Sequence, residues 1–166
     1  MKSDSRHVEI KIGQKSKKFL VHEVADWEVV AKYLVKLIKP GSVIALSGPL
    51  GAGKTTLTQF IARELGVKKN AISPTFALMR IYHVARSSKL VARKISDEMR
   101  DAVKRSCEIR RVVHVDAYRI ESERDAMVLD LYEELLEPGT LMIIEWPENI
   151  KKIVSRLKPI KVAIKY

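Results

Sequence analysis

One stretch of the chain has the residue types and spacing of a phosphate-binding loop. Residues 48–55 read GPLGAGKT and fit the pattern G-x-x-x-x-G-K-[ST]. Glycines let backbone N–H groups turn inward around a polyphosphate. Lys54 would place its charge on the β- and γ-phosphates, and the Thr55 hydroxyl could bind Mg²⁺. The sequence therefore predicts a nucleotide site made by the consecutive residues Gly48, Pro49, Leu50, Gly51, Ala52, Gly53, Lys54, Thr55 and Thr56.

Two carboxylates follow apolar segments further along the chain. Residues 112–116 read VVHVD and end at Asp116, and residues 141–145 read LMIIE and end at Glu145. Ligands of open α/β sheets bind at such carboxyl ends of strands, and a nucleotide hydrolase needs a carboxylate near Mg²⁺ and a group that orients water. We predict these roles for Asp116 and Glu145, and the sequence leaves open which residue has which role. His114 alternates inward with its neighbours and is predicted to be a core histidine.

A further polar segment, SPTF at residues 73–76, precedes a predicted strand. Thr75 could contact a γ-phosphate and order this segment when ATP and Mg²⁺ are bound. By its local pattern alone, the segment is a Ser-Pro turn.

These groups need a sheet to position them, and the chain alternates apolar runs with amphipathic segments. This alternation predicts an α/β fold in one domain, residues 1–166, with a mostly parallel sheet, helices on both faces and antiparallel edge strands. Helices are expected near residues 29–38, capped by Asp26, and over residues 54–65, ending at Gly66. Strands are expected at residues 8–12, 19–24, 43–47, 77–84, 111–115, 141–145 and 161–165.

A basic segment interrupts this order at about residues 85–111. Its apolar residues recur every three or four positions, which predicts an inserted amphipathic helix lying on the protein's own core. Cys107 belongs to this stripe. Because it is the single cysteine, it can form neither an internal disulfide nor a cysteine zinc site.

The net charge of +11 indicates a polyanionic partner, either nucleic acid or an acidic surface. The excess lies in residues 1–18, 86–111 and 149–166, whereas the remainder, which includes the loop and both carboxylates, is net negative. No stretch approaches the roughly 20 apolar residues that span a bilayer, and the N-terminus lacks the apolar run of a signal peptide. We therefore expect a cytoplasmic protein.

Four segments together resemble the TsaE (YjeE) family of small bacterial P-loop ATPases. They are LSGPLGAGKTTLTQFIARELG at residues 46–66, SPTF at 73–76, HVDAYR at 114–119 and IIEWPEN at 143–149. The sequence departs from the family in having Pro49 where aspartate is usual and about twenty additional residues before HVDAYR.

The resemblance implies slow hydrolysis of ATP to ADP and phosphate, activated by TsaB–TsaD-type partners. It implies a role in forming N6-threonylcarbamoyladenosine at position 37 of tRNAs that read ANN codons, with tRNA reached through the partner complex and no role with DNA or a membrane. It places Lys54 on the phosphates, Thr55 and Glu145 on Mg²⁺, and Asp116 as a catalytic or water-mediated metal contact. Thr75 becomes a switch residue and Trp146 an aromatic beside the site.

A small-molecule kinase is the alternative, because such enzymes also pair a short P-loop domain with a basic phosphate site. A kinase would need a mobile arginine-rich lid. The apolar stripe of the insert argues against that role, since a lid has little to bury.

Overall fold

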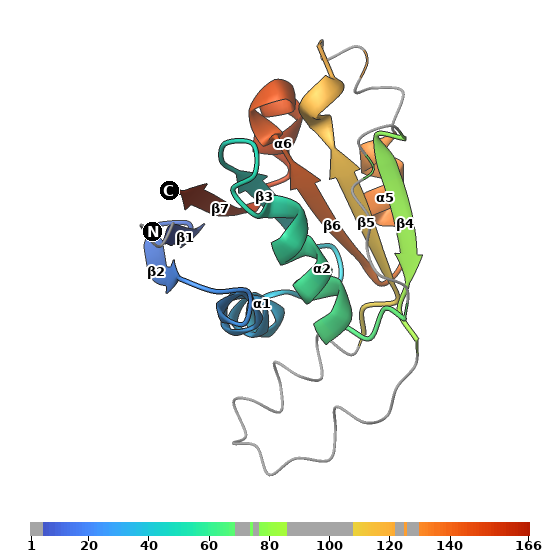
Figure 1. The fold of residues 1–166 in the computed structure, drawn as a ribbon. Helices are drawn as coiled ribbons and strands as arrows, with labels where there is room; N and C mark the ends of the chain where they lie inside the picture. Colours follow the sequence, from blue (N-terminus) through green and yellow to red (C-terminus); the bar gives the residue numbers. More distant parts are fainter. Residues whose placement is uncertain (1–4, 69–73, 75–76, 86–107, 122–124, 126–129) are drawn as a thin grey trace.

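The fold is built on one seven-stranded sheet with the strand order β2-β1-β7-β3-β6-β5-β4 (Figure 1). The computed structural model describes residues 5–68, 74, 77–85, 108–121, 125 and 130–166. The four central strands β7, β3, β6 and β5 run parallel, and β1, β2 and β4 add antiparallel pairs at the two edges. The strands are β1 (Arg6–Ile12), β2 (Lys15–Val21), β3 (Val43–Ser47), β4 (Met79–His83), β5 (Arg111–Asp116), β6 (Thr140–Glu145) and β7 (Ile160–Lys165).

Helices cover both faces of the sheet, as predicted. The longer ones, α1 (Asp26–Leu37) and α2 (Lys54–Glu64), pack on one face, and α5 (Leu131–Leu136) and α6 (Lys151–Arg156) pack on the other. Alternation along β3 shows the division, because Ile44 and Leu46 belong to the core under α1 and α2, whereas Val43 and Ala45 face the other core. Two short 3₁₀ helices, η2 (Ala117–Arg119) and η3 (Pro147–Ile150), follow β5 and β6.

The central strands were predicted well, and the N-terminal hairpin was not. β3 has the predicted bounds, whereas the second strand was expected at residues 19–24 and lies at Lys15–Val21. The turn consequently shortens to Gly13 and Gln14, with Ile12 opposite Lys15. β2 is an edge strand whose lysines point into solvent, so the polar run pairs with β1 instead of forming a loop. Val24 is 66% exposed and lies outside the strand.

Helix α2 ends at Glu64 and is followed by Gly66 at φ +91°, as the glycine stop signal predicted. The prediction that Asp26 caps α1 was wrong. Its carboxylate accepts hydrogen bonds from the backbone N–H groups of His22 and Glu23, which precede the helix, at 2.8 and 3.1 Å. Helices α5 and α6 were not predicted, because six-residue helices show too few turns for a clear periodicity.

The predicted amphipathic helix of the insert lies outside the described residues, apart from the last residues of the segment, where Arg111 begins β5. Among the described residues, no helix has the length and apolar character needed to cross a membrane.

Candidate functional site

The phosphate-binding loop connects the end of β3 to the start of α2, at the carboxyl ends of the parallel strands (Figure 1). Its first and last glycines adopt backbone angles that other residues rarely take, and a side chain at either position would clash with a neighbouring element. Gly48 has φ +150°, and a Cβ there would lie 2.5 Å from the carbonyl oxygen of Ile164. Gly53 has φ +103°, and a Cβ there would lie 2.5 Å from the Trp27 ring. The loop therefore packs closely on β7 and α1, which fixes the direction in which its backbone turns.

Lys54 is the first residue of α2, and it is buried with 5% of its surface exposed. Its ammonium group donates to the carbonyl oxygens of Gly48 at 2.7 Å and Pro49 at 2.9 Å and lies 3.8 Å from the centre of the Trp146 ring. Burial lowers the pKa of Lys54, and the negative charges of Glu145, Glu148 and Asp116 oppose this shift. A buried ammonium is thus held inside the loop by neutral carbonyls and an aromatic face, where a phosphate would be a stronger partner.

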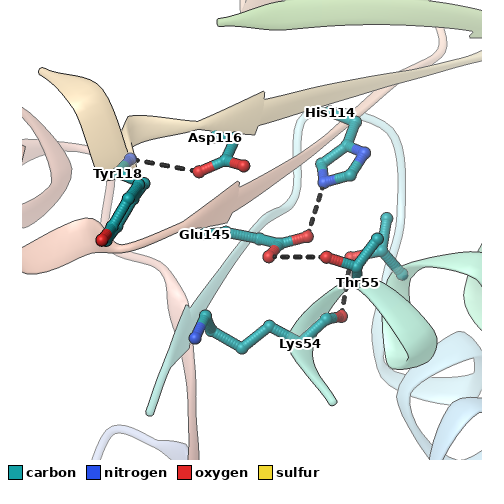
Figure 2. Close-up of polar contacts among 7 residues, drawn as sticks. Lys54, Thr55, His114, Asp116, Tyr118 and Glu145 are labelled. Atoms are coloured by element: carbon teal, nitrogen blue, oxygen red, sulfur yellow. Dashed lines mark hydrogen bonds and ion pairs between the residues drawn. The ribbon is translucent and has the colours of Figure 1, made fainter. Parts of the chain in front are cut away.

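Glu145, the last residue of β6, connects the loop helix to the neighbouring strand (Figure 2). One carboxylate oxygen accepts a hydrogen bond from the Thr55 hydroxyl at 3.0 Å, and the other lies 2.7 Å from His114 Nε2. Glu145 is 2% exposed and His114 is fully buried. The carboxylate is therefore held from both sides, by the helix and by β5.

Asp116, the last residue of β5, lies opposite Glu145 in the parallel β5–β6 register. Its Oδ1 accepts a hydrogen bond from the Tyr118 backbone N–H at 3.1 Å and so caps η2 (Figure 2). The Tyr118 ring packs on the Trp146 ring at 4.9 Å between centroids. The Asn149 amide donates to the carbonyl oxygens of Ala117 and Tyr118, which ties η3 to η2. These contacts fix the two strand ends relative to each other.

The loop and the two strand ends enclose a pocket of about 260 Å³. The sequence analysis had placed nine of these ten lining residues at or beside the site, and Tyr118 was not expected there. The lining is Leu50, Gly51, Gly53, Lys54, Thr55, Thr56, Asp116, Tyr118, Glu145 and Trp146. A lysine, two threonines, a tyrosine and two carboxylates thus line one cavity.

The donor set of this pocket fits Mg²⁺ bound together with a nucleotide. Within the described ranges, no group of three or more His, Cys, Asp or Glu side chains could hold a metal ion. Magnesium in nucleotide sites typically takes one or two protein oxygens and completes its shell with phosphate oxygens and water. Thr55 and Glu145, whose oxygens lie 3.0 Å apart at the mouth of the loop, supply oxygens of this kind.

Three predicted site residues do not line this pocket. Gly48, Pro49 and Ala52 shape the loop, and Ala52 is buried beneath it. Thr75 lies outside the described residues. Sequence reasoning treated His114 as a core residue, and it is buried as predicted but also contacts Glu145. Strand alternation could have placed both side chains on one face, but their adjacency depends on the β5–β6 register.

Tyr166 is a further residue that sequence reasoning did not place at the loop. Its hydroxyl donates to the carbonyl oxygen of Leu50 at 3.1 Å, and the Arg6 guanidinium lies over its ring at 5.5 Å. The residue that follows β7 therefore supports the phosphate-binding loop at Leu50.

The family model and the curated relatives that this chain matches agree on one family. The family model described as "Threonylcarbamoyl adenosine biosynthesis protein TsaE" matches residues 21–166. The chain is similar to the tRNA threonylcarbamoyladenosine biosynthesis proteins TsaE of Streptomyces coelicolor, with 34% identity over 72% of this chain, and of Rickettsia prowazekii, with 32% identity over 75%. The aligned regions span 66% and 70% of those two proteins.

Among solved structures, a crystal structure of Bacillus subtilis YdiB matches with a TM-score of 0.54 and 22% sequence identity. The match covers 86% of this chain and 72% of the YdiB chain. It supports the fold, an α/β sheet with the phosphate-binding loop between β3 and α2.

Proposed function

The chain belongs to the TsaE family, and on this basis we propose that it is a Mg²⁺-dependent ATPase that supports N6-threonylcarbamoyladenosine formation at position 37 of ANN-decoding tRNAs. One observation carries the proposal. The Thr55 hydroxyl at the start of α2 lies 3.0 Å from the Glu145 carboxylate at the end of β6. This pairing joins the phosphate-binding loop to an acidic strand end, which is the arrangement needed to hold magnesium beside a triphosphate.

Each charged group in the pocket has a proposed task. Lys54 would leave the carbonyls of Gly48 and Pro49 and hold the β- and γ-phosphates. Thr55 and Glu145 would hold Mg²⁺, which neutralises charge on the phosphate oxygens as the terminal phosphate leaves. Asp116, which lies opposite Glu145, would act as a catalytic or water-mediated contact and orient the attacking water.

Two parts of the proposal extend beyond the pocket. Thr75 would act as a switch residue at the γ-phosphate, a role that stays a prediction because the residue lies outside the described ranges. We also propose that partners of the TsaB–TsaD type activate hydrolysis in the cytoplasm, and that tRNA meets this chain through those partners. The family membership supports this second part.

A candidate contact surface for the partner lies on the outer side of β2, β1 and β7. Four exposed lysines alternate there with core residues, and we call them the lysine face: Lys11, Lys18, Lys161 and Lys165. Lys11 lies directly opposite Lys161 in the β1–β7 pairing, where like charges destabilise a sheet. Glu9 on the same face pairs with Lys11 at 3.2 Å, which offsets one of the four charges and leaves these five residues net positive. Lysines on an edge strand prevent pairing with other chains, which explains those on β2. This reason does not apply to β1 and β7, which are inner strands. We propose that an acidic surface of the protein partner docks here.

Reconstitution tests the proposed function. The chain is assayed for phosphate release from ATP alone and with candidate TsaB- and TsaD-type proteins, and complex formation is followed by gel filtration. We expect weak hydrolysis by the isolated chain and an increase of at least about tenfold with the partners. Partners that neither bind nor activate the chain would contradict the pathway assignment, whereas nucleotide binding would then still have to be tested separately.

A further inference from the structure

His114 is buried in the middle of the sheet, yet among the described residues only one of its ring nitrogens has a hydrogen-bond partner. Nε2 lies 2.7 Å from Glu145 Oε1, whereas Nδ1 is buried and makes no hydrogen bond within the described part of the chain. Buried polar atoms are normally paired, because desolvation without a partner costs free energy. An apolar side chain would fill this core position without that cost. The histidine therefore has its one specific interaction at Glu145.

The strand geometry directs this interaction. On β5, Val112 faces the core under α1 and α2, and alternation places His114 and Asp116 on the same side. On β6, Ile143 faces this core, so Glu145 also points toward α2. His114 pairs with Ile143 in the parallel register, and Glu145 follows two residues later on the same face of β6. The imidazole thus reaches diagonally to the carboxylate from the core side.

The two oxygens of Glu145 have separate donors. The Thr55 hydroxyl donates to Oε2, and His114 Nε2 lies 2.7 Å from Oε1. Since a carboxylate can only accept, we assign the proton of this second contact to Nε2, the tautomer that lets His114 donate to Glu145. A glutamate side chain has several rotatable bonds and loses rotational freedom when it is fixed. With Oε1 held by His114, Oε2 faces Thr55 at the start of the phosphate-binding loop.

We propose that His114 is a positioning residue for magnesium: it holds Glu145 in the orientation in which Oε2 and the Thr55 hydroxyl together receive the ion. The inference rests on the proposed ATPase function, and it assigns His114 no contact with nucleotide or metal. It predicts that loss of the Nε2 hydrogen bond weakens the effect of Mg²⁺ on nucleotide affinity. It also predicts that binding in the absence of Mg²⁺, which depends on Lys54 and the loop backbone, changes little.

Two isosteric substitutions separate positioning from simple packing. The amide nitrogen of glutamine stands as many bonds from Cβ as Nε2 does, so His114→Gln can still donate to Glu145. The amide nitrogen of asparagine corresponds to Nδ1, which makes no hydrogen bond to any described residue, so His114→Asn cannot donate to Glu145. His114→Leu removes the polar group entirely. Comparing the glutamine and asparagine variants keeps the test valid even if the leucine variant fails to fold.

The main measurement is the affinity for a fluorescent, non-hydrolysable ATP analogue with Mg²⁺ and with EDTA. The ratio of the two dissociation constants reports the effect of magnesium, and thermal melting checks folding. We expect the wild-type protein and His114→Gln to keep similar ratios, and His114→Asn and His114→Leu to lose at least about fivefold of the magnesium effect. EDTA affinities should agree within about twofold. Equal ratios in the wild type and all folded variants, or equal loss in the glutamine and asparagine variants, would overturn the inference.

A second readout does not depend on nucleotide. The ¹⁵N chemical shifts of the His114 ring report which nitrogen carries a proton, and we expect a protonated Nε2. A bare Nε2 would overturn the inference by itself. If the wild-type protein binds no nucleotide at all, the proposed ATPase function fails instead, so the two failures are distinguishable.

Discussion

The same residue type, lysine, is used in opposite ways in two regions of this molecule. Lys54 is buried at the start of α2, held by two loop carbonyls and an aromatic ring, and it faces a pocket that contains two carboxylates. The lysine face on β2, β1 and β7 presents Lys11, Lys18, Lys161 and Lys165 to solvent. The pocket holds its cation by three close contacts, whereas the lysine face has four exposed cations, of which Lys11 pairs with Glu9 at 3.2 Å.

This difference separates recognition of a ligand from attraction of a partner. A buried cation interacts strongly at short range because few solvent dipoles screen it. Exposed cations act through a field that salt screens within about 10 Å at 0.1 M ionic strength. On the proposed function, the chemistry would depend on Lys54, whereas most of the net charge of +11 would serve docking. Four predictions test this division, beginning with the largest expected effect.

Removing the Lys54 charge should abolish nucleotide-dependent activity. Lys54→Ala and Lys54→Met are both expected to weaken ATP affinity by at least about 100-fold, because the phosphates lose their main cation. Methionine retains most of the apolar stem, so its melting temperature should stay close to that of the wild-type protein. The measurements are fluorescence titration with an ATP analogue and thermal melting. Wild-type affinity or turnover in folded Lys54→Met would contradict the proposed role of the phosphate-binding loop in ATP binding.

Neutralising the two strand-end carboxylates should have different effects on the response of nucleotide affinity to Mg²⁺. Glu145→Gln is expected to reduce hydrolysis by about 100-fold and to weaken the response of nucleotide affinity to Mg²⁺, because Glu145 contacts Thr55. Asp116→Asn should reduce hydrolysis to a similar extent but leave the magnesium response of binding near that of the wild type. Rates of phosphate release and affinities measured with and without Mg²⁺ check both variants. The reverse pattern would exchange the two assignments.

Charge reversal on the lysine face should weaken partner binding and leave the pocket intact. The double variant Lys11→Glu/Lys161→Glu is expected to reduce affinity for the protein partner by about tenfold at low salt and less at high salt. The matched control is Lys15→Glu/Lys17→Glu, which makes the same charge change on the opposite side of the edge strand β2. Calorimetric titration at two salt concentrations measures the effect. Equal losses in both double variants would show a non-specific charge effect.

Alkaline pH should weaken ATP binding through Lys54, which is the smallest of the expected effects. Because burial lowers the pKa of Lys54 from its ordinary value of 10.5, the free protein loses this charge at a lower pH than an exposed lysine would. Bound phosphates favour the charged form, so binding takes up a proton as pH approaches that pKa, and affinity falls as pH rises through it. We expect the affinity of the wild-type protein for an ATP analogue, measured by fluorescence titration, to decrease by about threefold between about pH 8 and pH 10.

The control for this pH effect is Lys54→Arg, since a guanidinium stays charged over the same range. Its ATP affinity, however strong, should be constant between these pH values. A parallel decrease in the wild-type protein and the arginine variant would assign the effect to another group.

The sequence allowed the loop and the central strands to be predicted because their signals are local. The glycine-lysine-threonine spacing specifies the loop, and continuous apolar runs specify β3, β5 and β6, which are buried on both faces. β2 was wrong by several residues because Lys15–Lys18 look like a loop when read alone, and only pairing with β1 makes them a strand. Edge strands tolerate charge that central strands exclude.

Most residues that line the candidate site could be predicted one by one, but Tyr118 and the contacts inside the site could not. The order of chemical groups along the chain led to Lys54, Thr55, Asp116 and Glu145, all of which the structure places around one pocket. The contact of His114 with Glu145 joins strands that are neighbours in space and separate in sequence, so it depends on strand order and register. The role of the basic insert stays a prediction, because residues 86–107 lie outside the described residues.

The fate of the terminal phosphate of ATP tests the central claim most directly. The protein is incubated with γ-labelled ATP and Mg²⁺, with and without candidate partners and candidate acceptors, with Lys54→Met as the blank. We predict that label appears as free phosphate, together with ADP, in the wild-type reaction only. Label transferred to an acceptor would contradict the ATPase account in favour of a kinase, and turnover equal to that of the blank in the presence of bound partners would contradict both.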